Sequence, residues 1–207
     1  DDGTFGTLFM PSQTGGANWP GGAADPETGI MYIFSKSDVG RMSMSSRPER
    51  SDMDYINLQL RTAPRLSVDG LPLIKPPYGQ IVALDLNEGE KLWDVVHGET
   101  PDSIRNHPAL AGLDIPPTGQ AGRVGVLVTK TLVIAGDGGS YTNADGEQEA
   151  LLRAYDKLTG KQLGSLSMPA QQTGSPMTYA IDGVQYLVVA IAGSDVPGRL
   201  RVYSYGP

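Results

Sequence analysis

The sequence predicts an all-β fold, and three observations support that expectation. Helical periodicity is almost absent from the 207 residues. The apolar runs are short, rich in β-branched residues, and bounded by Gly, Asp, Asn and Pro, as is typical of strands and turns. The composition agrees, because 27 glycines and 16 prolines indicate many turns.

The first predicted element is an Asp turn followed by a strand. Residues 24–29 read Ala-Asp-Pro-Glu-Thr-Gly, and the apolar run Ile30 to Phe34 follows. The stretch 39–77 then predicts a long loop insertion, because its first part, Gly40 to Asp52, is polar and poor in strand formers. A plain surface loop and a functional lid are both compatible with it.

The next element, residues 80–93, shares a strand–turn–strand phrase with residues 152–163. In both phrases Ala precedes Asp by two residues and Gly follows that Asp by four. The matching residues are Ala83, Asp85 and Gly89 in the first phrase and Ala154, Asp156 and Gly160 in the second. Asp can hydrogen-bond the backbone of its own turn, and Gly supplies a positive φ. Such self-similarity favours a repeat architecture.

The remaining elements follow in order along the chain. Insertions are expected at 105–125 and 137–149, on either side of a strand at Thr131 to Ala135. The nearly uninterrupted apolar run Gln185 to Gly193 suits a strand buried on both faces. Arg199 to Tyr205 alternates like an exposed or closing strand.

The charge and composition exclude several classes of partner and site. A formal net charge of -7 opposes binding to nucleic acid or to an anionic membrane, which both need clustered Lys and Arg. No run of about 18 apolar residues is present, so no transmembrane segment is expected in this chain. Zero cysteines exclude disulfides and thiolate metal sites.

Three stretches together resemble the PQQ-dependent (quinoprotein) dehydrogenases of the membrane glucose dehydrogenase and quinoprotein alcohol dehydrogenase type. Residues 15–29 are similar to that family's Gly-Gly-x-Asn-Trp segment and the Asp-Pro-x-Thr-Gly turn after it. Residues 76–80 lead into the strand that ends at Trp93. Residues 174–186 are similar to the family's Thr-Pro-Met-Thr-Tyr and Gly-x-Gln-Tyr pair. The order of the three stretches points to the C-terminal portion of such an enzyme.

The resemblance implies an eight-bladed β-propeller in the full family, with blades joined by docking tryptophans. At about 40 to 50 residues per blade, residues 1–207 are expected to form a single propeller segment of roughly four blades. Trp93 fits a docking tryptophan. Gly164 stands where the second repeat would carry one, so that contact is expected to be lost or made differently.

The resemblance also implies pyrroloquinoline quinone (PQQ) as the cofactor, bound on the propeller axis beside calcium. By the same resemblance the calcium ligands and the catalytic carboxylate lie N-terminal to this segment, so no catalytic or metal-binding residue is assigned here. Asn18 matches a cofactor-contacting Asn, although a turn Asn that satisfies its own loop is the alternative. Trp19 is expected either to line the cofactor site or to pack between blades.

Other candidate sites are weaker. His97 and His107 lack metal-ligand spacing and are expected to be solvent-facing or satisfied within loops. Residues 143–147 faintly resemble a calcium loop but favour a hairpin turn, because Asp-Gly is a strong turn signal. Residues 136–139 lack the Lys-Ser or Lys-Thr of a phosphate loop, and no Gly-x-Ser-x-Gly elbow supports a hydrolase.

The expected function is therefore that of a segment of a dehydrogenase that oxidises an alcohol or a sugar hydroxyl, contributing one wall of the quinone site. Three alternatives stay open: a non-catalytic propeller module that binds partners or ligands, a small complete propeller, or two copies that pair to cover exposed sheet edges. The remaining propeller blades are the other expected partners. A periplasmic or secreted location is implied by the resemblance alone.

Overall fold

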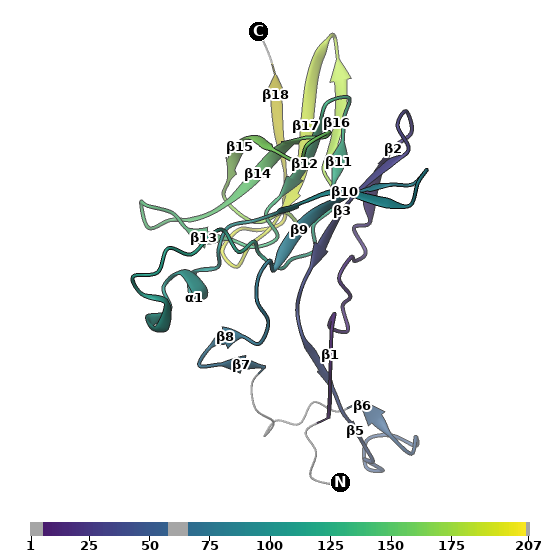
Figure 1. The fold of residues 1–207 in the computed structure, drawn as a ribbon, viewed down its shortest axis with the longest axis vertical. Coiled ribbons are helices and arrows are strands. Elements are labelled where there is room, and N and C mark those ends of the chain that lie inside the picture. Colours follow the sequence, from purple (N-terminus) through teal and green to yellow (C-terminus); the bar gives the residue numbers. More distant parts are fainter. Residues whose placement is uncertain (1–5, 58–65, 206–207) are drawn as a thin grey trace.

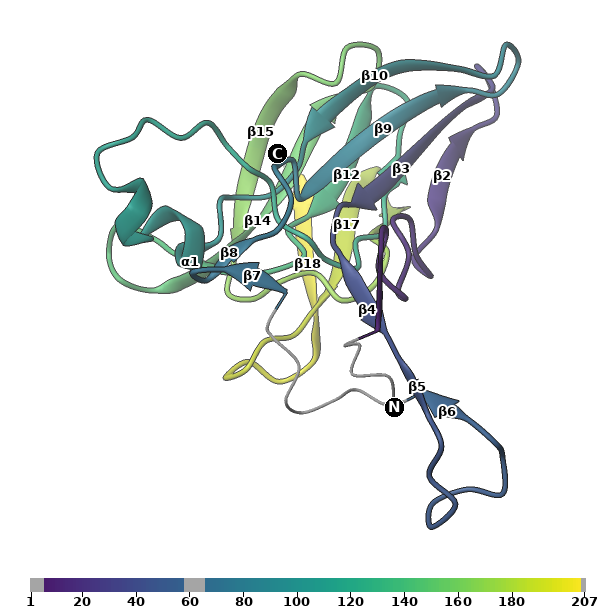
Figure 2. The ribbon, with the colours of Figure 1, turned by 60° about the horizontal axis from the view of Figure 1, so that its bottom comes forward.

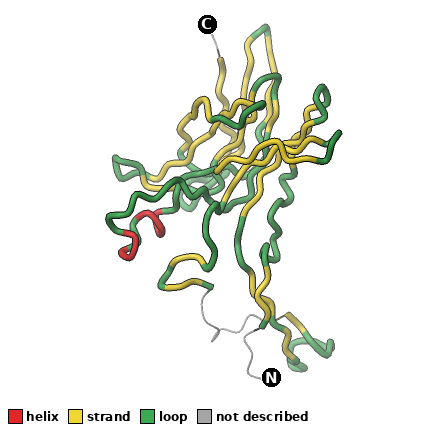
Figure 3. The backbone as a smooth tube through the Cα atoms, in the orientation of Figure 1, coloured by secondary structure: helices red, strands yellow, loops and turns green. Residues whose placement is uncertain are grey.

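The computed structural model describes residues 6–57 and 66–205 and consists almost entirely of strands and loops (Figure 1). Its helical content in those ranges is one short α-helix, α1 (Asp102–Arg105), and one 3-10 turn, Pro108–Leu110. Figure 3 shows both in a single excursion away from the sheets. The predicted all-β fold is confirmed.

The first blade-sized sheet has four antiparallel strands in the order β10-β9-β3-β2. They are β2 (Gly22–Asp25), β3 (Ile30–Lys36), β9 (Gly79–Asp85) and β10 (Glu90–Val96). The two predicted turns join these strands. In the first turn the Asp25 carboxylate accepts a hydrogen bond from the backbone N–H of Glu27 at 3.1 Å, and Gly29 adopts a φ of 72°.

The second sheet repeats this arrangement. It contains β11 (Leu127–Val128), β12 (Leu132–Gly136), β14 (Gln148–Asp156) and β15 (Gln162–Met168), and β13 (Tyr141–Thr142) pairs with the start of β14. The third sheet has three strands, β16 (Met177–Ile181), β17 (Val184–Ile191) and β18 (Arg199–Tyr205). Each sheet is a meander of antiparallel neighbours.

The described residues thus form three blade-sized sheets, fewer than the roughly four that the chain length suggested. The difference lies in the long connections, which take up residues without adding a blade. They hold three two-stranded ribbons: β1 (Thr7–Phe9) with β4 (Gly40–Met42), β5 (Met44–Ser45) with β6 (Ile56–Asn57), and β7 (Ser67–Val68) with β8 (Leu71–Pro72). The β5–β6 ribbon projects away from the three sheets (Figures 1 and 2).

Two apolar cores hold the sheets together in succession. The first core joins the first sheet to the second and includes Tyr32, Ile81, Val133 and Tyr155. The second core joins the second sheet to the third. Its buried residues are Ile134, Ala150, Leu152, Met168, Ala170, Val189 and Ile191. Opposite faces of the second sheet therefore serve different cores, as expected for a middle blade.

The strand predicted to be buried on both faces is buried over only part of its length. In β17, Val188, Val189 and Ile191 are buried, whereas Gln185 is exposed. The second core covers the end of β17 nearest Ile191. The other end lies beside an open groove between the second and third sheets, and its partner strand β18 is mostly exposed.

Antiparallel pairing sends the long connections and the short turns to opposite ends of the sheets. Residues 37–78, 97–126, 137–147 and 169–176 connect strands at one end, here called the loop end. The turns at Asp25, Asp85 and Asp156 lie at the other, the turn end. Contacts between sheets keep the ends in register, since Gln172 N–H donates to Asp137 O at 3.0 Å at the loop end, and Lys157 Nζ donates to Asp25 Oδ2 at 2.6 Å at the turn end.

Trp93 makes the docking contact that the resemblance implied. It extends from the last strand of the first sheet, and its Nε1–H donates to the backbone carbonyl of Lys157 in the second sheet at 3.2 Å. Its ring lies against Gly160, where an added Cβ would come within 2.8 Å of Trp93 Cε3. Gly164, in the second repeat, faces open space, so no such contact is made there.

Candidate functional site

A polar hollow at the loop end brings together the segments that precede the first strand of each sheet. Thr14 comes before β2, residues 121–123 before β11, and residues 171–173 before β16; Lys36 and Gly138 complete the lining. The volume of this axial hollow is about 530 Å³. The blades of a propeller surround a central channel, so a hollow bounded by the entries to three first strands is a candidate place for a ligand.

Asn18 does not line the axial hollow, but its side chain bonds to Thr14, which does. The Asn18 side-chain amide donates to the backbone carbonyl of Thr14, and its Oδ1 accepts a hydrogen bond from Trp19 N–H at 2.6 Å. The backbone carbonyl of Asn18 also accepts from Gly21 N–H at 2.8 Å. In this structure Asn18 organises its own turn, directly beside a residue of the hollow.

Trp19 is the most exposed large apolar side chain in the described part of the molecule, with 96% of its surface accessible. Trp19 therefore does not pack between the three sheets of the described residues. The side chain leaves the same turn as Asn18, at the loop end. An indole held in solvent offers a flat surface on which a planar ligand can stack.

The charges around the axial hollow are two cations and one paired carboxylate. Lys36 Nζ donates to Thr14 Oγ1 at 2.6 Å and to Asp38 Oδ2 at 2.8 Å. Burial opposes ionisation of Asp38, but hydrogen bonds from Lys36 and Ser12 outweigh it and hold the pKa of Asp38 below its usual value. Arg123 is exposed on the rim.

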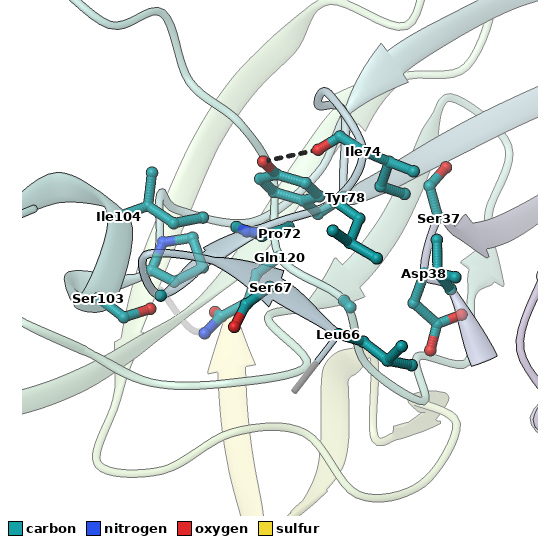
Figure 4. A pocket seen from close by; sticks show the side chains of 15 residues that line it. Ser37, Asp38, Leu66, Ser67, Pro72, Ile74, Tyr78, Ser103, Ile104 and Gln120 are labelled. Atoms are coloured by element: carbon teal, nitrogen blue, oxygen red, sulfur yellow. Dashed lines mark hydrogen bonds between the residues drawn. The ribbon is translucent and has the colours of Figure 1, made fainter. Parts of the chain in front are cut away.

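Figure 4 shows the side chains that line a second hollow, of about 450 Å³. Its wall comes mainly from the β3–β9 connection and from the segment around α1, and the two hollows share Ala121. Asp38, Ser67, Ser103 and Gln120 contribute polar groups, and the rest of the wall is largely apolar. Among the described residues, Gln120 Oε1 is the one buried side-chain polar atom without a hydrogen-bond partner.

Both histidine side chains make hydrogen bonds to other residues of the protein. His97 is fully buried, its Nε2–H donates to Gly136 O at 3.1 Å, and its Nδ1 accepts from the Tyr155 hydroxyl at 2.8 Å. Burial lowers the pKa of His97, which keeps this neutral tautomer. His107 is exposed, and its Nε2 bonds to Asp69 O at 2.7 Å. The expectation of a solvent-facing or loop-satisfied histidine is confirmed for His107. It is wrong for His97, which lies in the core and bonds to residues of β12 and β14.

The hairpin reading of residues 143–147 is also confirmed. Asn143 Oδ1 accepts hydrogen bonds from the backbone N–H groups of Asp145 and Glu147, at 3.0 and 2.9 Å, and Gly146 has a φ of 80°. In the described residues no group of three or more His, Cys, Asp or Glu side chains is placed to hold a metal ion. No helix in those residues is long and apolar enough to cross a membrane.

Sequence reasoning missed Lys36, Arg123 and Gln120. No motif marks them, because they come from separate connections that meet only when the sheets pack side by side. The one sequence feature that could have drawn attention to any of the three was the position of Lys36 at the end of a predicted strand.

Comparison with known families decides the identity of the fold. Residues 3–187 match the model of the family described as PQQ, the β-propeller domain of glucose/ethanol/alcohol dehydrogenases. The chain belongs to this family. The resemblance inferred from the three sequence stretches is thereby confirmed, and so is the partial propeller.

Known relatives of this quinoprotein segment are much longer. It is 28% identical to a probable quinate dehydrogenase (quinone) of Xanthomonas campestris pv. juglandis, over 93% of this chain and 25% of the relative. It is 33% identical to the quinoprotein glucose dehydrogenase of Escherichia coli (strain K12), over 91% of this chain and 25% of the relative. The chain thus spans about a quarter of the length of these relatives.

Solved structures show the same fold. A quinohemoprotein alcohol dehydrogenase from Pseudomonas putida HK5 superposes with a TM-score of 0.57 at 20% identity, covering 93% of this chain and 24% of that one. The quinohemoprotein alcohol dehydrogenase from Comamonas testosteroni gives the same TM-score at 18% identity, over 89% of this chain and 23% of that one. The arrangement of the three sheets is therefore that of a propeller segment.

Proposed function

We propose that this chain is the segment of a PQQ-dependent dehydrogenase that contributes one wall of the quinone site, with Asn18 and Trp19 at the cofactor. The observation that carries the proposal is the axial hollow, where the segments leading into the first strands of all three sheets meet. Asn18 holds the turn beside this hollow through its bond to Thr14.

The residues around the hollow fit the chemistry of PQQ, which is a planar quinone that carries carboxylates. Lys36 and Arg123 provide positive charge for those carboxylates. The amide of Asn18 can exchange its local bonds for bonds to a quinone edge, because it can both donate and accept. Trp19 offers an exposed ring for stacking, close to Asn18 in the same turn.

The chemistry divides between the cofactor and the protein. PQQ would supply the two-electron acceptor for oxidation of an alcohol or a sugar hydroxyl. Residues of this chain would orient the quinone plane, through Asn18 and Trp19, and neutralise its carboxylates, through Lys36 and Arg123. The second hollow, with polar groups on an otherwise largely apolar wall, would admit the hydroxylated substrate. The catalytic carboxylate and the ligands of a calcium ion would come from other parts of the enzyme, in the periplasm or in a secreted form.

A calorimetric titration with PQQ, with and without calcium, tests the proposal. We expect saturable binding to the chain and a Kd raised about tenfold by Asn18→Ala, which corresponds to the loss of about one good hydrogen bond. Asn143→Ala is the matched control, because Asn143 organises a different turn, and it should leave the Kd unchanged. Equal Kd values for the two variants would remove Asn18 from the site.

The alternative function is a non-catalytic module that binds a partner or a second copy. It is favoured by the outer edge of β18, where Leu200 and Val202 are 69% and 49% exposed, and by the third sheet, which has three strands where the first has four and the second has five. Further blades of a longer chain would cover the same edge. Absence of PQQ binding together with a dimeric mass in solution would favour this alternative, and a monomeric mass would contradict pairing of two copies.

A further inference from the structure

The pairing register identifies equivalent positions in the first and second sheets. Trp93 pairs with Ala83, and Gly164 pairs with Ala154, so Gly164 occupies the place of Trp93. A shift in register follows the pair in both sheets. On the other side of the same alanines, Tyr32 pairs with Ala83 and Ile134 pairs with Ala154. Two aromatic side chains of the first sheet thus correspond to Gly and Ile in the second.

Both aromatic rings are used to close the space between the first and second sheets. The centroids of the Tyr32 and Trp93 rings lie 5.7 Å apart. The Tyr32 hydroxyl and the Trp93 Nε1–H both donate to the carbonyl of Lys157, at 3.1 and 3.2 Å. Gly160 leaves room for the indole. The interface is filled at the turn end as well as at its centre.

The corresponding space between the second and third sheets is open. A Cβ at Gly164 would meet no atom within 4 Å, and a groove of about 820 Å³ runs along this interface. Its lining is largely apolar and includes Ala154, Leu166, Leu187 and Val202. Ala154 and Leu187 also pack against the second core, so the groove is an unfilled continuation of the interface between these two sheets.

We propose that this groove binds a planar aromatic compound of one or two fused rings, in the place that the Trp93 indole takes between the preceding pair of sheets. Apolar cavities far smaller than this one hold aromatic ligands when they are lined by aliphatic side chains. The lining also carries polar groups, among them Lys130, Thr178 and Gln185, and they suit a ligand with one polar substituent. The groove lies toward the turn end, away from the axial hollow, and the proposal does not depend on PQQ binding.

The probe is indole, titrated into the full chain and followed by NMR. We expect saturable shifts and nuclear Overhauser effects from indole protons to the methyl groups of Leu166, Leu187 and Val202. These contacts require no variant, so they test the site even if a substitution disturbs folding. Failure to saturate, or contacts elsewhere, would overturn the proposal.

Gly164→Trp provides the second test, because its own indole would fill the groove. It should abolish saturable indole binding and raise the Tm. Leu163→Trp is the matched control: Leu163 is the neighbouring residue on β15, already 58% exposed, and this variant should still bind indole. Undiminished binding to Gly164→Trp would contradict the assignment.

Two comparisons distinguish other occupants of the groove. Cyclohexanol should bind at least several-fold more weakly than indole, and equal affinity would mean that the groove has no preference for aromatic rings, which overturns the proposal. If instead a second copy of the chain fills the groove, the protein will be dimeric and indole will compete with dimer formation. If the protein is monomeric and binds indole, the result supports a groove that is occupied by a small ligand.

Discussion

Asp137 and Arg153 form a buried ion pair at the loop end of the second sheet. Asp137 is fully buried and accepts hydrogen bonds from Arg153 Nε at 2.7 Å and from Leu151 N–H at 3.0 Å. Arg153 also reaches Glu99 at 2.9 Å, and Glu99 pairs with Arg105. This network fixes the loop end, since it ties the second sheet to the connection that enters it from the first.

Removal of the buried carboxylate should therefore be costly. Asp137→Ala leaves the Arg153 guanidinium buried without its main partner, and we expect the free energy of unfolding to fall by about 3–5 kcal/mol. Urea denaturation measures this change in the free energy of unfolding. The exposed Asp114→Ala is the control and should change stability by less than about 0.5 kcal/mol. A small effect at Asp137 would mean that Glu99 compensates for the loss.

His97 predicts the pH dependence of stability in mildly acidic solution. Burial lowers its pKa in the folded state, while the unfolded chain takes up the proton at about pH 6.5. The stability that depends on neutral His97 is thus fully present above about pH 6.5 and is lost as the pH falls toward the folded pKa. The urea midpoint should drop between pH 7.5 and 5.5, and His107→Asn should not remove the drop. A urea midpoint that stays constant between pH 7.5 and 5.5 would contradict this prediction.

At the level of elements, the turns were predictable and the long connections were not. Asp and Gly at fixed spacing determine a turn through contacts within five residues, so the hairpins at Asp85 and Asp156 could be located from the sequence alone. The stretch 39–77 was predicted as a loop, yet it contains the ribbon β5–β6 and the local hairpin β7–β8, which turns at Asp69-Gly70. Only the pairing of β4 with β1 depends on a distant segment. Chain length suggested roughly four blades where the described residues form three blade-sized sheets, because length does not reveal how much chain a connection uses.

A comparison of Gly160 with Gly89 distinguishes the contribution of a turn glycine to its own turn from its contribution to the contact between sheets. Both have positive φ, 72° and 74°, but a Cβ at Gly160 would collide with Trp93, whereas a Cβ at Gly89 would meet nothing within 4 Å. Gly89→Ala should cost about 1–2 kcal/mol for backbone strain alone. Gly160→Ala should cost a further 1–3 kcal/mol, roughly the penalty of overpacking a core. If chemical denaturation gave the same loss of unfolding free energy for both variants, Trp93 docking would contribute little to stability.

At the scale of the whole molecule, the two ends of the sheets differ in structure. The turn end carries the repeated Asp–Gly turns and the docking of Trp93, which join one sheet to the next. The loop end gathers irregular segments around the axial hollow. Asn18 and Trp19 could be nominated from the sequence because a motif carries them, while Lys36 and Arg123 could not, since only the packing of three sheets brings their connections together.

The most direct test of this account is to map PQQ binding onto the chain by amide NMR. We predict chemical-shift changes at the loop end, in the turn of Asn18 and at Thr14, Lys36 and residues 121–123, with the turns at Asp85 and Asp156 unaffected. Shifts concentrated at the turn end, or spread evenly over both ends, would contradict the assignment of the axial hollow as the quinone site.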